Sequence, residues 1–122
     1  MGYTTEFRGS FKITPPLSEY DRDRIIKEAE TRHGDNFKED PKYPGFWLHW
    51  VPNKEGTALG WDGGEKFYNY IGWLKFLINA YFEPGNYKLD GTVKWIGEDK
   101  FEDLGIITVK NNIVTVKGRP RA

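Results

Sequence analysis

The chain has 122 residues, and its 18 lysines and arginines balance 18 aspartates and glutamates, so the formal net charge is zero. A chain of this length fits one domain, and the lack of cysteine excludes disulfides, thiolate metal sites and cysteine nucleophiles. Neutrality also argues against a nucleic-acid partner. With no long apolar run and no signal-like amino terminus, we expect one α+β domain over residues 1–117, a basic tail at 118–122, no membrane contact and a cytoplasmic location.

The first two elements show clear signals. Alternation over residues 6–14 predicts a half-buried strand with Phe7 and Phe11 facing the core. Ser18, three residues before Asp21, approximates a capping box and predicts a helix from Ser18 to His33. In that helix His33 lies in the last turn, where its charge complements the helix dipole. Residues 34–45 are predicted to form a loop.

Residues 46–51 and 57–61 are predicted to form a hairpin around the turn Asn53–Gly56. If Pro52 pairs with Thr57, one face of this hairpin points to the core and the other points away from it. The core-facing residues are then Leu48, Trp50, Leu59 and Trp61, and the opposite face carries Trp47, His49, Val51, Ala58 and Gly60.

A second helix is predicted from Gly64 to Phe82, because apolar residues recur at spacings of three and four. Asp62 lies three residues before Glu65, and this spacing marks Asp62 as its N-cap. A helix N-terminus can also bind an anion, but the two carboxylates would repel one.

The rest of the chain predicts a strand at 87–96 and a hairpin of residues 104–110 and 113–117 around Asn111-Asn112. The order β-α-β-β-α-β matches the split, ferredoxin-like plan, with two helices on one sheet face and the C-terminal hairpin added. The other face is then open or partly covered by that hairpin. A mixed sheet with another strand order is the alternative.

Residues Trp61–Tyr70 read WDGGEKFYNY and are followed by Trp73-Leu74. A Tyr-Thr-Thr-Glu-Phe start, a Gly-x-Val-x-Trp strand at Gly91–Trp95 and a Val-Lys-x-Asn-x-Val hairpin at Val109–Val114 complete a pattern over most of the chain. In this pattern the chain resembles a family of short, uncharacterised bacterial and phage proteins. The segment between the first helix and Phe46 is shorter in this chain than in that family. The resemblance implies a bacterial or phage origin, but no activity and no site residues.

The aromatic content, 16%, exceeds what one small core is expected to use. On a helical wheel of the second helix, Trp73 and Phe76 fall beside the main apolar stripe, together with Asn69 and Ala80. Exposed aromatic residues are typical centres of protein interfaces. We therefore predict a non-enzymatic interaction module that binds a protein partner or forms a homodimer through this flank. The alternative is that the first helix or the C-terminal hairpin packs on this flank.

A second hypothesis is a small-ligand or enzyme site formed by Trp47, His49, Asp62 and Glu65, in which His49 pairs with a carboxylate. With two histidines at unrelated positions we expect no metal, and no motif indicates a cofactor. A third hypothesis is single-stranded nucleic acid on a strip of Arg8, Lys12 and Lys94. The sheet aromatics that such proteins use for stacking are missing from the predicted outward positions.

Overall fold

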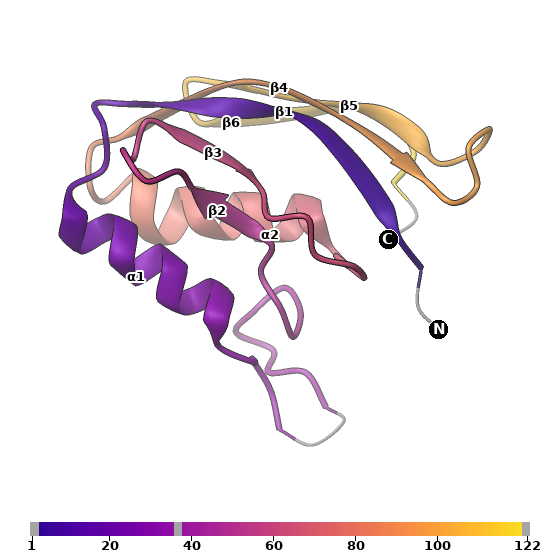
Figure 1. Ribbon diagram of the computed structural model, residues 1–122, viewed down its shortest axis with the longest axis horizontal. Coiled ribbons are helices and arrows are strands. Elements are labelled where there is room, and N and C mark those ends of the chain that lie inside the picture. The colour runs from indigo at the N-terminus through magenta and orange to yellow at the C-terminus, as the bar shows by residue number, and fades with distance from the viewer. Residues whose placement is uncertain (1–2, 36–37, 121–122) are drawn as a thin grey trace.

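The computed structural model describes residues 3–35 and 38–120, which form one antiparallel sheet with helices on one of its faces (Figure 1). In chain order the elements are β1 (Thr5–Thr14), α1 (Glu19–Glu30), β2 (Trp50–Pro52), β3 (Ala58–Trp61), α2 (Tyr70–Leu77), the π-helical turn η1 (Ile78–Phe82), β4 (Lys88–Gly97), β5 (Leu104–Lys110) and β6 (Ile113–Gly118). The strand order across the sheet is β2-β3-β1-β4-β5-β6.

The predicted α+β class is confirmed. The two strands joined by α1, β1 and β2, are separated in the sheet by β3, and β1 separates β3 from β4, the strands joined by α2. The hairpin of β5 and β6 extends the sheet beside β4 and does not fold back over it. Within the described part of the chain, the sheet face opposite the helices is therefore open (Figure 1).

Aromatic rings fill the layer between the sheet and the helices. The ring of Phe7 lies 5.1 Å from Trp50 and 4.9 Å from Tyr70, and Phe67 lies 5.2 Å from Trp50. Aromatic residues no more than 1% exposed are Phe11, Trp50, Phe67, Tyr70, Trp73 and Phe82. Much of the aromatic content that composition marks as surplus therefore belongs to the core, where large rings contribute strongly to stability.

The first helix begins as predicted and ends earlier. Ser18 caps α1, because its hydroxyl accepts the backbone N–H of Asp21 at 3.1 Å. The helix ends at Glu30, so the placement of His33 in its last turn was wrong. The backbone N–H of His33 donates to the carbonyl of Phe46 at 2.8 Å, and its buried ring lies 5.2 Å from Trp73.

The second helix begins six residues later than Gly64. The backbone of Lys66 and of Asn69 has positive φ, 60° and 53°, which interrupts any helix through them, and Asn69 is the N-cap of α2. The prediction of Asp62 as N-cap was therefore wrong. The C-terminal end at Phe82 is correct, although the last turn widens into η1.

The hairpin of β2 and β3 pairs two residues away from the predicted register, with Pro52 opposite Leu59 instead of Thr57. A shift of two residues returns each side chain to the same face. Leu48, Trp50 and Leu59 are accordingly buried, as predicted, whereas Trp61 is half-buried. The strand predicted at 46–51 is shorter, because β2 begins only at Trp50.

The C-terminal hairpin agrees with the predicted register, and β6 extends one residue beyond the prediction, to Gly118. Ile107 pairs with Val116 and Val109 with Val114. Asn111 and Asn112 both have positive φ, 51° and 69°, as a two-residue type I′ turn requires.

Candidate functional site

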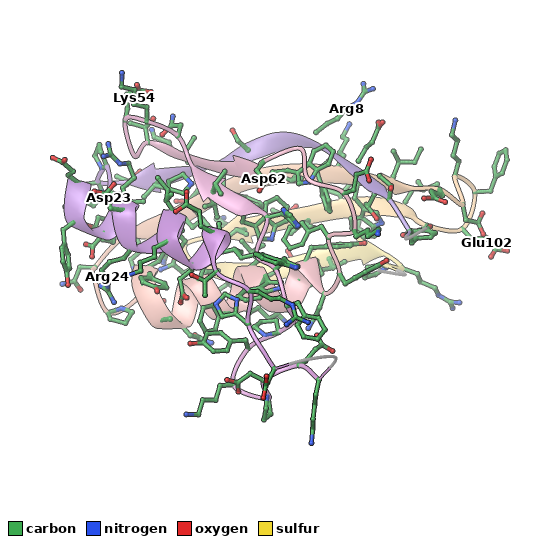
Figure 2. The ribbon with its side chains drawn as sticks, turned by 60° about the horizontal axis from the view of Figure 1, so that its bottom comes forward. Arg8, Asp23, Arg24, Lys54, Asp62 and Glu102 are labelled. Atoms are coloured by element: carbon green, nitrogen blue, oxygen red, sulfur yellow. The ribbon has the colours of Figure 1, made fainter. Side chains whose placement is uncertain are left out.

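A row of three cations crosses the open face of the sheet. Arg8 on β1 pairs with Lys94 on β4, Lys94 pairs with Ile106 on β5, and Ile106 pairs with Lys117 on β6. Directly paired residues of antiparallel strands point to the same side of the sheet. Figure 2 shows Arg8 projecting away from the helices. The row therefore presents its charges to solvent.

Arg8 and Lys94 are like charges in directly opposite positions. Such a pair destabilises a sheet by a few tenths of a kcal/mol to about 1 kcal/mol. Neither residue forms an ion pair with a carboxylate among the described residues. No ion pair therefore offsets this repulsion within the described part of the chain, where Glu6 in the next row is the neighbouring carboxylate, and a bound anionic group would relieve it.

A second row on the same face begins with Glu6 on β1 and continues with two apolar residues. Ile96 pairs with Leu104, and these residues are 37% and 48% exposed. Together with Ile106 they form the floor of a groove of about 610 Å³. The groove is lined by Glu6, Arg8, Lys94, Trp95, Ile96, Leu104, Gly105, Ile106, Lys117 and Gly118. We call it the sheet-face groove.

Two neighbouring hollows extend the sheet-face groove. One of about 360 Å³ shares Glu6, Arg8 and Ile96 with it and reaches Lys100 in the loop between β4 and β5. Another of about 440 Å³ shares Ile106 and Lys117. The depression thus runs across the sheet from the start of β1 to β6.

Charge is unevenly distributed over the molecule. The strand residues on the open face include the cations Arg8, Lys12, Lys88, Lys94, Lys110 and Lys117 and the carboxylates Glu6 and Asp90. The complete chain is neutral. Zero net charge is therefore compatible with a cation-rich face.

The predicted interface flank of α2 is largely covered. Trp73 is 0% exposed, and its placement at the surface was wrong. Its ring lies 5.4 Å from Phe76 and 6.3 Å from Tyr43, which belongs to the segment between α1 and β2. Phe76 is half-buried, while Asn69 and Ala80 remain exposed. The cover comes from Tyr43 and not from the first helix or the C-terminal hairpin, the two elements expected on this flank.

The residues of the predicted ligand site lie in two places. His49 Nδ1 is 3.0 Å from both carboxylate oxygens of Asp62, and Asp62 Oδ1 accepts the N–H of Gly64 at 2.7 Å. Trp47, 42% exposed, lies at a separate hollow of about 140 Å³, and Glu65 is exposed on the turn that follows Asp62. That hollow is lined by Glu39, Phe46, Trp47, Lys66 and Tyr68. The structure thus joins His49 to Asp62 but not to Trp47.

Among the described residues no cluster of three or more histidines and carboxylates is arranged to hold a metal ion. None of the helices formed by these residues is long and apolar enough to cross a membrane.

Comparison of the chain with protein-family models, curated proteins and solved structures finds no match. The chemistry of the sheet-face groove is therefore the basis for a functional assignment.

Sequence reasoning named Arg8, Lys12 and Lys94 but missed Lys117 and the floor residues Ile96 and Leu104. The signal in the sequence was Ile96, a large apolar residue at a position that should face solvent. The inward-facing positions of its strand are those of Val93 and Trp95, which are buried. Apolar side chains in a solvent-facing phase mark a surface that another molecule covers.

Proposed function

We propose that the protein is a non-enzymatic interaction module whose sheet-face groove binds an acidic, amphipathic segment of a partner protein. The observation that carries this proposal is the uncompensated pair of Arg8 and Lys94 beside the exposed floor residues Ile96 and Leu104. Carboxylates of the segment would pair with the cationic row, and its aliphatic side chains would cover the floor. Charge complementarity of this kind favours specific and rapid association.

A protein segment fits this groove better than a nucleic acid. Sheet surfaces that bind single strands stack bases on exposed aromatic rings. The groove floor is aliphatic, and threonines occupy the next row of the open face at Thr92, Thr108 and Thr115. Aliphatic and hydroxyl groups suit the side chains of an extended peptide.

We further propose that β1 to β4 with α1 and α2 form the split β-α-β plan of ferredoxin-like domains, to which β5 and β6 are added. The support is that each helix connects two strands with a third strand between them. This plan places both helices on one face of the sheet and leaves the other face for binding.

The proposal is tested by nuclear magnetic resonance of ¹⁵N-labelled protein titrated with a synthetic peptide in which glutamate alternates with leucine. We expect the largest shift changes at Arg8, Lys94 and Ile106. Lys94→Thr should raise the dissociation constant about tenfold, which corresponds to about 1.4 kcal/mol. Lys12→Thr is the matched control, because Lys12 lies on the same face but pairs with Asp90 outside the groove.

Two further ligands decide between classes of partner. A peptide with lysine in place of glutamate should not bind. If the lysine peptide binds equally well, or the shifts map away from the groove, the proposal is wrong. Tighter binding of an oligothymidylate to the groove would overturn the protein partner in favour of nucleic acid.

A further inference from the structure

The outermost strand of the hairpin, β6, is an uncovered edge of the sheet. It pairs with β5 on one side, and no described strand follows it on the other. Its side chains are exposed on both faces, with Ile113 68% and Val116 38% exposed. Val116 lies on the side of the sheet that faces the helices, where its neighbour Val114 already packs against the core. The apolar row that begins in the core thus continues into solvent at this edge.

The hairpin geometry fixes which backbone groups of β6 are free. In a two-residue turn the carbonyl of Lys110 accepts the N–H of Ile113, so the backbone of Ile113 faces β5. Polar groups alternate along a strand, and those of Thr115 and Lys117 therefore also face β5. The N–H and C=O groups of Val114 and Val116 point to the free edge. Exposed edges of this kind are templates for another strand.

We propose that two copies of this chain associate through β6, antiparallel, around a twofold axis that passes between their Thr115 residues. In this register the free groups of Val114 meet those of Val116 of the second copy. The same pairing brings the valine side chains together, which extends the apolar row across the interface. Each subunit sheet then continues into the other as one sheet.

The proposed register also keeps like charges apart. In the proposed register Lys117 faces Ile113 of the second copy, so the lysines do not oppose each other. Shifting the axis to Val116 would pair Val114 with Gly118 and leave it without an apolar partner. The complete chain carries no net charge that would repel a second copy.

The opposite edge of the sheet does not offer the same surface. Strand β2 has three residues and ends in Pro52, which has no N–H to donate. It also packs against α1. Strand β6 is twice as long and its edge is not covered by a described element. The second copy is therefore expected at β6.

Multi-angle light scattering measures the association directly. We expect a mass of twice 14.2 kDa at micromolar to millimolar concentration. Hydrogen exchange should show the amides of Val114 and Val116 protected in the dimer, in addition to those that face β5. If the chain is a monomer throughout this range, the proposal is wrong. It is also wrong if the edge of β6 binds a peptide from another protein while the chain stays monomeric.

Two substitutions on the open face separate the interface from the fold. Thr115→Lys puts two lysines face to face at the axis and should weaken dimerisation at least tenfold. Thr108→Lys, in the same row as Thr115 but one strand farther from the axis on β5, is the matched control and should leave the dimer intact. If both variants dimerise like the wild type, β6 is not the interface and the inference fails.

A mixed sample of labelled and unlabelled chains tests the register. Antiparallel strands bring the Hα atoms of non-hydrogen-bonded pairs close together. An intermolecular Hα contact between Thr115 and Thr115 of the second copy is expected. A dimer that lacks this contact has another interface, and the proposal is then wrong even though the chain dimerises.

Discussion

The hydroxyl of Tyr81 donates a 2.7 Å hydrogen bond to Oε2 of Glu28, across 53 positions of the chain. The other oxygen of this carboxylate lies 3.1 Å from Nε2 of His33. One side chain of α1 is thereby tied both to η1 and to the start of the segment that covers Trp73. Burial, together with the hydrogen bond to Glu28, raises the pKa of Tyr81 above its ordinary value.

The first prediction concerns alkaline stability. Because the pKa of Tyr81 is raised in the folded state, its contribution is present below the unfolded pKa of about 10 and is lost as the pH rises above it. Tyr81→Phe should cost about 1–2 kcal/mol at about pH 8. Its deficit should shrink at about pH 11, as urea unfolding would show. If the loss of stability were the same at both pH values, the contribution of the Tyr81 hydroxyl would not depend on its protonation.

The second prediction concerns stability at acid pH, which should depend on Asp21. The hydroxyl of Tyr87 donates to Oδ2 of Asp21 at 2.7 Å, and this hydrogen bond lowers the pKa of Asp21 below its ordinary value. The stabilisation is present above the unfolded pKa of about 3.9 and is lost as the pH falls through the lower folded value. Tyr87→Phe should therefore destabilise the protein by about 1 kcal/mol at neutral pH and by much less at about pH 2. Equal losses at both pH values in urea titrations would contradict this.

Replacing Trp73 by alanine should reduce the stability of the protein far more than replacing Trp47. Trp73 is 0% exposed and Trp47 is 42% exposed. We expect Trp73→Ala to lower the free energy of unfolding by about 3–5 kcal/mol, since the cavity would be large. Trp47→Ala should cost about 1 kcal/mol or less. Chemical denaturation distinguishes the two outcomes, and a stable Trp73→Ala protein that has lost only self-association would restore the interface first assigned to α2.

The start of α2 shows why a local pattern can mislead. Apolar residues keep helical spacing before Tyr70, yet Lys66 and Asn69 adopt positive φ and delay the helix. Asp62 instead binds His49, 13 positions earlier in the chain. A capping motif gives no information about such a distant partner, and the tertiary contact prevails over local preference.

Strands were predicted more successfully because alternation depends only on whether a residue faces the core. Leu89 and Val93 are buried as the pattern requires, and the errors of register in β2 and β3 left the faces unchanged. The burial of Trp73 was not predicted, because the residue that covers it, Tyr43, lies in a segment with the composition of a polar loop.

The same distinction explains the groove. Alternation placed Arg8 and Lys94 on the outer face, and that placement is correct. Their direct opposition depends on β1 and β4 being neighbours, which follows from the strand order and not from either strand alone. The sequence can therefore predict which cations share the outer face, but their alignment in one row across the sheet follows only from the strand order.

The opposition of Arg8 and Lys94 makes a prediction about stability. Lys94→Glu replaces a repulsive pair by an attractive one and should raise the free energy of unfolding by about 0.5 kcal/mol. Lys12→Glu should lower it by a similar amount, because Lys12 faces Asp90 and the variant creates a like-charge pair. Urea unfolding at low ionic strength measures both effects, and about 1 M salt should reduce both by screening. Were Lys94→Glu as destabilising as Lys12→Glu, Lys94 would have a favourable partner in the native fold, and the argument that the groove needs an anionic occupant would lose its basis.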